Sequence, residues 1–101
     1  MNLRYTPQAI LDLEQIRDYI SYNLQNPDAA KNTIRTIAGK AASLKDMPYL
    51  GVELRRKIGR DVEGRALIVG RYMVIYDVAE EISILRVLDT RVDYLRMIGT
   101  W

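Results

Sequence analysis

The side chains that could do chemistry in this chain are arginines and a tyrosine in its C-terminal half. Arg91 and Tyr94 are spaced so that a helix would place them on one face, and Arg65 and Arg71 bracket a short apolar run. An arginine can bind a phosphate or an acidic protein surface through two parallel hydrogen bonds, which lysine cannot reproduce. We therefore predict Arg65, Arg71, Arg91 and Tyr94 as candidate functional residues. The alternative for Arg91 is a surface ion pair with a nearby aspartate, which typically contributes about 0–1 kcal/mol.

Composition excludes several kinds of site. The 101 residues include no cysteine and no histidine, so disulfides, zinc–thiolate sites, imidazole metal sites and Ser-His or Cys-His pairs cannot form. Neither GxxxxGK[ST] nor GxGxxG occurs. We predict that the chain binds no catalytic metal, nucleotide or redox cofactor. Carboxylates such as Asp77, Glu80 and Glu81 could hold a weak divalent ion, but acids at a hairpin turn more often serve solubility.

Basic residues are concentrated in one stretch of an otherwise balanced chain. The formal net charge of +2 is too small to imply nucleic-acid binding by itself. Between residues 55 and 71, six basic side chains face two acidic ones, and such a run is usually a solvated loop. No apolar run approaches the roughly 18 residues that a membrane span needs, and the N-terminus lacks the apolar core of a signal peptide. A soluble, cytoplasmic protein is expected, which the absence of cysteine also fits.

Two helices with clear start signals should position the N-terminal half. Thr6-Pro7 and Asn26-Pro27 each place an N-cap residue before a proline at the first helical position. We predict helices over 7–24 and 27–46, joined as an antiparallel hairpin that packs on one face of a sheet. The apolar stripes are Ile10, Leu13, Ile16 or Arg17, Ile20 and Leu24 on the first helix, and Ala30, Ile34, Ile37, Ala41 and Leu44 on the second. Small residues, Ala30, Ala38 and Ala41, should allow close approach of the helices.

The remaining apolar segments have the period of strands. We predict a short edge strand near 2–6 and three antiparallel strands at 65–69, 72–78 and 82–88, the first pair joined by a Gly70-Arg71 turn. The residues between the hairpin and these strands should form a loop, which could contain a short strand near 54–58. Asp89 or Thr90 could cap a last short helix through Leu95 and Ile98. The predicted fold is α+β, in the order β-α-α-β-β-β with a short C-terminal helix or tail, forming one domain over 1–101.

Both faces of the two central strands are apolar. Tyr72, Val74, Tyr76 and Val78 alternate with Met73 and Ile75, and Ile82, Ile84 and Leu88 alternate with Leu85 and Val87. An antiparallel sheet that is covered on one side normally has a polar outer face. The hairpin can cover one face, so the other should be covered by the C-terminal tail, a second copy or a foreign chain. A sheet buried on both sides without a partner is the alternative.

Four segments, in their order and spacing, resemble the RelE/ParE family of toxins from bacterial toxin–antitoxin systems. They are AILDLEQIRDYI, NPDAA, GRYMVIYDV and ILRVLDTRVDY. The resemblance covers nearly the whole chain and implies a cytoplasmic growth-inhibiting toxin. It also implies a co-expressed antitoxin whose extended or helical C-terminal segment wraps the toxin in a hetero-oligomer. An obligate pair of this kind would bury on the order of 2,000 Å² or more.

The two branches of the family differ in target. RelE-type members cleave messenger RNA on the ribosome with basic residues on central strands, but the matched positions here are Met73 and, near the preceding strand, Gly64 and Ala66. A shift of one residue would bring in Arg65, and only the late pair Arg91 and Tyr94 matches. The long hairpin and the phrases GRYMVIY and ILRVLDTR resemble the ParE branch, which inhibits DNA gyrase by binding rather than by catalysis. Gyrase inhibition is therefore the leading hypothesis, with a ribosome-dependent ribonuclease and a non-toxic binding module as alternatives.

Overall fold

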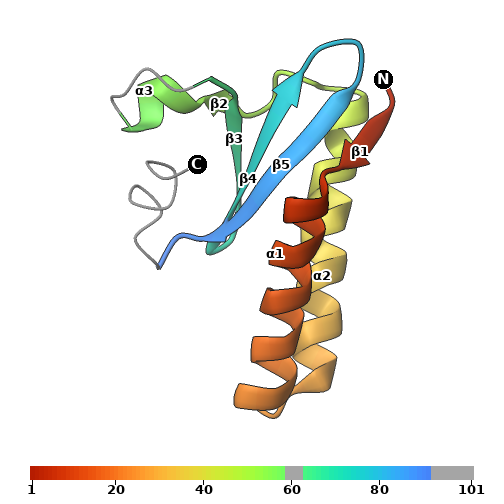
Figure 1. Cartoon of the computed structure of the whole chain (residues 1–101), viewed down its shortest axis with the longest axis vertical. Coiled ribbons are helices and arrows are strands. Elements are labelled where there is room, and N and C mark those ends of the chain that lie inside the picture. Colours follow the sequence, from red (N-terminus) through yellow and green to blue (C-terminus); the bar gives the residue numbers. More distant parts are fainter. Residues whose placement is uncertain (59–62, 92–101) are drawn as a thin grey trace.

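The computed structural model describes residues 1–58 and 63–91. Within these ranges five strands form one sheet, in the order β1-β5-β4-β3-β2. A helical hairpin lies on one face of the sheet and extends past its end (Figure 1). The elements are β1 (Leu3–Tyr5), α1 (Pro7–Asp18), a π-helical turn (Tyr19–Asn23), α2 (Pro27–Ala42), a 3-10 turn (Ser43–Lys45), β2 (Val52–Glu53), α3 (Leu54–Ile58), β3 (Arg65–Val69), β4 (Tyr72–Val78) and β5 (Ile82–Asp89).

The sheet confirms the predicted α+β class and the antiparallel meander. β3 pairs with β4 and β4 with β5, all antiparallel, and the turn between β3 and β4 uses Gly70 with a φ of +60°. β1 is an edge strand, as predicted, and runs parallel to β5, with Leu3 opposite Ile82. At the other edge β2 has two residues, pairing Val52 with Ala66.

The predicted N-caps of both helices are confirmed. Thr6 Oγ1 accepts a hydrogen bond from the N–H of Ala9 at 3.2 Å, and Asn26 Oδ1 accepts one from the N–H of Ala29 at 3.1 Å. Each cap satisfies a backbone donor that the helix leaves unpaired, and each precedes a proline at the helix start. The prediction of an antiparallel hairpin is confirmed, although the first helix changes to a π-helical turn after Asp18.

Part of the predicted apolar stripes is wrong. Ile37, Ala41 and Leu44 are buried in the main core, but Ile10, Leu24 and Ala38 are exposed. Ile10 is turned outward because α1 presents Ala9 and Asp12 to the sheet instead. Leu24 follows the π-helical turn, whose wider winding rotates later residues off the stripe. Ala38 is exposed on the solvent side of α2, so it does not allow a closer approach of α1 and α2.

The sheet is buried on both faces, as the strand pattern indicated. Facing the hairpin is a core that includes Tyr72, Val74, Tyr76, Ile82, Ile84 and Val87, and the opposite face carries Leu54, Ala66, Met73, Ile75 and Leu88. A bulge in β5 at Leu85 places Val87 on the same face of the sheet as Ile84 and turns Leu88 to the opposite face. The predicted alternation of side chains along β5 therefore fails beyond Leu85. These residues of the second face are buried within the single chain, whereas Ile68, which shares that face of β3 with Ala66, is 45% exposed.

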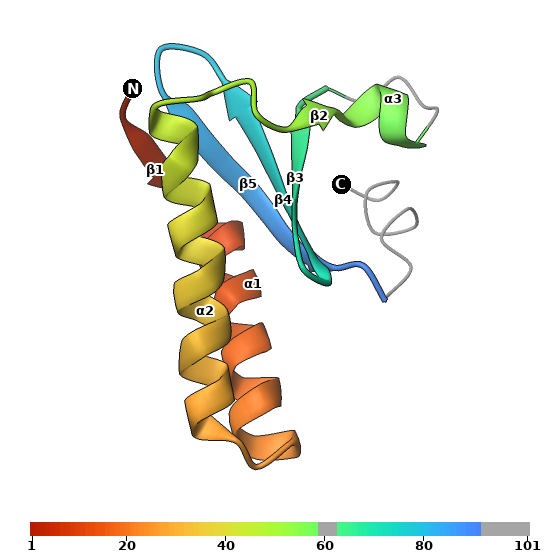
Figure 2. The ribbon, with the colours of Figure 1, turned by 180° about the vertical axis from the view of Figure 1, so that it is seen from behind.

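The predicted short strand near 54–58 is wrong. The strand lies earlier, at Val52–Glu53, and Leu54–Ile58 forms α3, on the far side of the sheet from the hairpin (Figure 2). Leu54 is fully buried against the second face, and its N–H donates to the carbonyl of Gly64 at 3.0 Å. β3 begins at Arg65, which lies opposite Glu53, so β2 cannot continue beyond Glu53 along β3. The predicted C-terminal helix lies outside the described residues. None of the helices in the described ranges is both long and apolar enough to cross a membrane.

A close approach at Gly51 gives a first prediction. The buried hydroxyl of Tyr76 donates to the carbonyl of Pro48 and accepts from the N–H of Gly51, both at 2.9 Å. A Cβ at Gly51 would lie 2.6 Å from the carbonyl oxygen of Ala66. Gly51→Ala is therefore expected to lower the free energy of unfolding by about 1–3 kcal/mol, measured by urea denaturation. The matched control is Gly39→Ala, where nothing lies within 4 Å of the new methyl group and a gain of about 0.5–1 kcal/mol is expected.

Candidate functional site

A buried ion pair anchors the helical hairpin to the sheet. Arg86 donates from Nε to Asp12 Oδ2 at 2.9 Å and from Nη2 to Asp12 Oδ1 at 3.2 Å. The N–H of Val87 donates to the same Oδ2 at 2.9 Å, and Gln8 donates to Oδ1 at 3.1 Å. The side chains of Asp12 and Arg86 are only 5% and 14% exposed, so each charge depends on the other for solvation. This contact fixes α1 against β5 and thereby places the rest of the hairpin.

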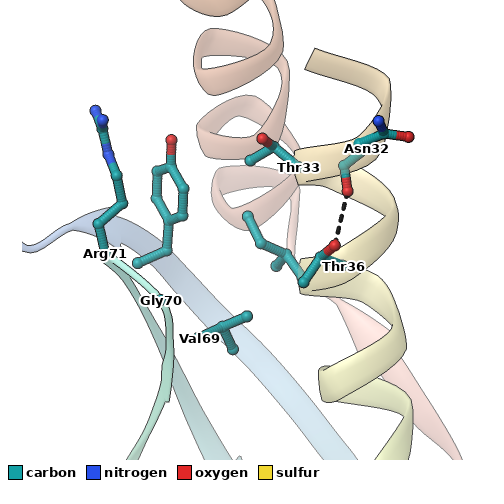
Figure 3. A pocket seen from close by; sticks show the side chains of 8 residues that line it. Asn32, Thr33, Thr36, Val69, Gly70 and Arg71 are labelled. Atoms are coloured by element: carbon teal, nitrogen blue, oxygen red, sulfur yellow. Dashed lines mark hydrogen bonds between the residues drawn. The ribbon is translucent and has the colours of Figure 1, made fainter. Parts of the chain in front are cut away.

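Two grooves open where the hairpin passes the end of the sheet. The larger, of about 280 Å³, lies between α2 and the β3–β4 turn, and we call it the α2 groove. Asn32, Thr33 and Thr36 of α2 line one side of it, and Val69 and Gly70 line the other (Figure 3). The smaller, of about 170 Å³, lies between α1 and the end of β5, and we call it the α1 groove. The two grooves share their Arg71 and Tyr72 walls.

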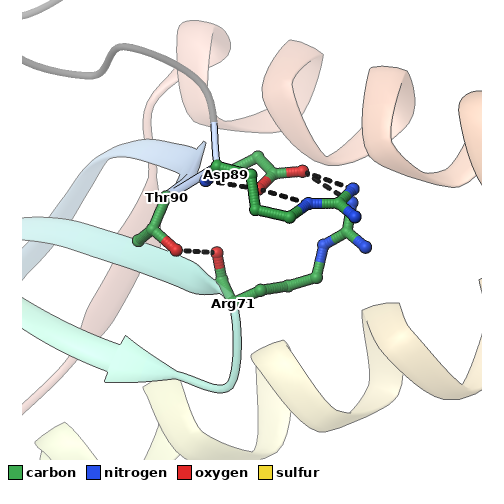
Figure 4. A network of polar contacts seen from close by, with 4 residues as sticks. Arg71, Asp89 and Thr90 are labelled. Carbon is green, nitrogen blue, oxygen red and sulfur yellow. Dashed lines mark hydrogen bonds and ion pairs between the residues drawn. The ribbon is translucent and has the colours of Figure 1, made fainter.

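A small charge network stands between the grooves (Figure 4). Arg71 Nη2 and Arg91 Nη2 both contact Asp89 Oδ2, at 2.8 and 3.2 Å, and the N–H of Arg91 donates to Asp89 Oδ1 at 2.9 Å. Thr90 donates to the carbonyl of Arg71 through its N–H at 2.7 Å and its hydroxyl at 2.6 Å. Two guanidinium groups on one carboxylate leave an excess of positive charge at this end of the sheet.

Tyr72 joins this network through its ring. The guanidinium carbon of Arg71 lies 5.4 Å from the ring centroid of Tyr72, a cation–π contact. Burial raises the pKa of the Tyr72 hydroxyl above its ordinary value, and Arg71 offsets part of that shift. Tyr72 is therefore neutral near pH 7 and keeps a hydroxyl that can donate. Arg71 Nε is buried and has no hydrogen-bond partner within the described residues.

The structure brings together some of the predicted residues and separates others. Arg71 and Arg91 meet at Asp89, whereas Arg65 lies at the opposite end of β3. Arg65 donates to the carbonyl of Gly51 at 2.8 Å from Nη2 and 3.1 Å from Nε, and its guanidinium lies over the ring of Tyr49. Arg65 and Arg71 therefore do not form one site, because β3 separates them. Tyr94 lies outside the described residues.

Comparison with known proteins assigns the chain to a family. A family model described as the ParE toxin of the type II toxin–antitoxin system parDE matches residues 3–94. The chain belongs to the ParE toxin family. A solved chain from the chromosomal ParDE toxin–antitoxin system of P. aeruginosa is 26% identical, with a TM-score of 0.73, over 88% of this chain and 95% of that chain. No curated protein matches.

Membership of the ParE family confirms the recognition made from the four sequence segments and the preference for the ParE branch. Sequence reasoning missed the polar wall of the α2 groove and the buried pair of Asp12 and Arg86. A signal for Asp12 was present, because it lies three residues after Ala9 and four residues before Ile16 and so shares a helix face with these apolar residues. The partner of Asp12 could not be found this way, since it lies on β5 at the other end of this ParE-family sequence.

Proposed function

We propose that this ParE-family chain is a cytoplasmic toxin that inhibits DNA gyrase by binding it, and that a cognate antitoxin neutralises the toxin in a hetero-oligomer. The observation that carries the proposal is the pair of guanidinium groups, from Arg71 and Arg91, held around Asp89 between the two grooves. Asp89 neutralises one of the two charges, and Arg71 Nε has no partner within the described residues. An acidic protein surface is the chemistry that this arrangement fits, because arginine binds carboxylates through paired hydrogen bonds.

Burial of two strand positions favours binding over RNA cleavage. The positions that match the basic residues of RelE-type strands include Met73 and Ala66, which are 0% and 2% exposed. A side chain with no exposed surface cannot reach a phosphate, and methionine and alanine carry no charge to stabilise one. At the end of the sheet where Arg71 and Arg91 meet, the nearby carboxylate of Asp89 already accepts from both arginines, which favours a binding role for this cluster.

The grooves support the proposal of an antitoxin partner. They flank Tyr72 and combine apolar walls with a few polar groups, as peptide-binding grooves do. The P. aeruginosa chain is described as part of a ParDE system, which is a toxin with its antitoxin. An antitoxin segment that fills both grooves would also cover Arg71 and so block the surface assigned to gyrase.

Expression of the chain without an antitoxin tests the proposal. Growth should stop, DNA breaks that depend on gyrase should accumulate, and messenger RNA on ribosomes should stay intact. Message cleavage without DNA breaks would favour a ribonuclease and overturn the proposal. Normal growth at high expression would favour the third alternative, a binding module that is not toxic.

A further inference from the structure

We propose that two exposed tyrosines at the far end of the helical hairpin, Tyr19 and Tyr22, extend the gyrase-binding surface beyond Arg71 and Arg91, and that their rings fill apolar pockets on gyrase. This inference rests on the proposed inhibition of gyrase and deepens it, because it names further contact residues and the shape of the partner surface. Three features of the described residues support it: the exposure of the two rings, the π-helical turn that carries them, and the continuity of Tyr19 with the α1 groove.

The π-helical turn exposes two tyrosine rings around a buried residue. Ile20 is 7% exposed, whereas Tyr19 and Tyr22 are 47% and 76% exposed. Tyr22 is the most exposed large apolar side chain among the described residues. A ring so exposed buries little surface within the chain, so Tyr22 contributes little to the stability of the fold. Tyrosine is, however, one of the residue types that dominate the binding energy of protein interfaces.

The backbone of this turn is held in an unusual conformation. The N–H of Leu24 donates to the carbonyl of Tyr19, and the N–H of Asn26 donates to the carbonyl of Ile20, both at 3.2 Å. Gln25 has a φ of +50°, a left-handed conformation that is unfavourable for most residues other than glycine. Turns of the π-helical type and such backbone outliers are concentrated at functional sites. Because the backbone is fixed in advance, the tyrosines lose less conformational freedom when they bind.

Tyr19 connects this turn to the guanidinium groups at the end of the sheet. It lines the α1 groove together with Arg71 and Asp89. Tyr22 is ten residues beyond Asp12, the anchor of α1, which corresponds to roughly 15 Å of helix. The hairpin extends past the end of the sheet here (Figure 1). A partner that contacts both Arg71 and Tyr22 must therefore be broader than either groove.

A globular partner fits these contacts better than a peptide segment. A segment seated in a groove contacts the walls of that groove, and Tyr22 is not among the residues that line either groove beside Arg71. A standard protein interface buries about 800 Å² on each partner, which is enough to reach from the guanidinium groups to the π-helical turn. The matching surface would present carboxylates to Arg71 and Arg91 and apolar pockets to the two rings. We assign this surface to gyrase.

Charge argues against a second copy of this chain at the same surface. A two-fold pair would place the same residues on both sides of the contact. Each copy would bring two guanidinium groups on the single carboxylate of Asp89. Like charges that face one another oppose association, whereas an acidic foreign surface has no such conflict.

The substitution Tyr22→Ala tests the inference, with purified gyrase as the probe. Truncation of an interface hot spot weakens binding by about 30-fold or more, and Tyr22→Ala should lower the affinity for gyrase by that factor. Tyr22→Phe should bind within about threefold of the wild type, because the ring that fills the pocket is kept. The matched control is Tyr49→Ala. Tyr49 is 67% exposed, but it lies beneath Arg65 at the other end of the sheet, so its loss should leave the affinity unchanged.

Two further measurements on Tyr22→Ala separate target binding from other roles. Its urea midpoint and its affinity for the proposed cognate antitoxin should match those of the wild type, because Tyr22 is exposed and does not line the two grooves. The inference is wrong if Tyr22→Ala binds gyrase as tightly as Tyr49→Ala, if its urea midpoint falls, or if it loses affinity for the antitoxin as much as for gyrase. It is also wrong if the free chain is a dimer that Tyr22→Ala dissociates. Failure of the wild-type chain to bind gyrase would contradict the proposed function itself, and this inference with it.

Discussion

Replacing Asp12 with alanine is expected to lower the free energy of unfolding by about 3–5 kcal/mol, a large part of the stability of a domain of this size. The substitution leaves the guanidinium of Arg86 buried without its carboxylate and removes the acceptor of the Val87 N–H. An unpaired buried charge costs far more than the pair contributes when intact. Urea denaturation followed by circular dichroism measures the change, provided that the slope of the transition is unaltered.

Two further variants separate this effect from a general loss of charge. Asp18→Ala also removes an aspartate of α1 that pairs with an arginine, but Arg17 and Asp18 are both about half exposed, so a change within about 0.5 kcal/mol is expected. The double variant Asp12→Ala, Arg86→Met should recover much of the loss, because no buried charge is left unpaired. Equal losses in Asp12→Ala and Asp18→Ala would contradict the assignment of this pair as the anchor of the hairpin.

The double variant Arg71→Ala, Arg91→Ala is expected to abolish growth inhibition while the chain stays folded. A hydrogen bond to a charged group contributes about 1.5–3 kcal/mol, so loss of each guanidinium should weaken binding to the target by roughly 10- to 150-fold. Lysine at both positions should restore activity poorly, because an ammonium group cannot form the paired contacts of a guanidinium. Growth curves after induction and binding of the purified variants to gyrase give the two readouts.

The control for this prediction is Arg56→Ala. Arg56 is an exposed arginine in an ion pair with Glu53, at 3.3 Å, and it lies at the other end of the sheet. Toxicity and stability should both remain at the wild-type level. Full toxicity of the Arg71 and Arg91 double variant would show that the active surface lies elsewhere. Loss of toxicity through unfolding would show that Asp89 and its two arginines serve the fold.

Local signals were sufficient to predict most of the fold. Threonine or asparagine before proline marked the start of both helices, and glycine at the first position of a two-residue turn marked the hairpin of β3 and β4. The errors arose where a local pattern met a long-range contact. Ile10 is apolar and correctly spaced, but α1 turns Asp12 inward to reach Arg86. The bulge at Leu85 reversed the faces of the last residues of β5, and nothing in the local alternation indicates it.

The candidate site was predictable in part for the same reason. Arg71 and Arg91 meet because Tyr72 pairs with Asp89, which places the start of β4 beside the end of β5. No local pattern sets that register, so an ion pair of Arg91 with a nearby aspartate could be expected from the sequence, but the approach of Arg71 to the same aspartate could not. Arg65 is close to Arg71 in the sequence, but the length of β3 separates them. The guanidinium of Arg65 donates instead to the carbonyl of Gly51.

Supercoiling by purified gyrase is the most direct test of the proposed function. The wild-type chain should inhibit the reaction at stoichiometric concentrations, and the proposed cognate antitoxin should restore it when added in equal amount. The double variant of Arg71 and Arg91 should be inactive at the same concentration, and Arg56→Ala should act like the wild type. Unimpaired supercoiling in the presence of a folded wild-type chain that still arrests growth would contradict gyrase as the target.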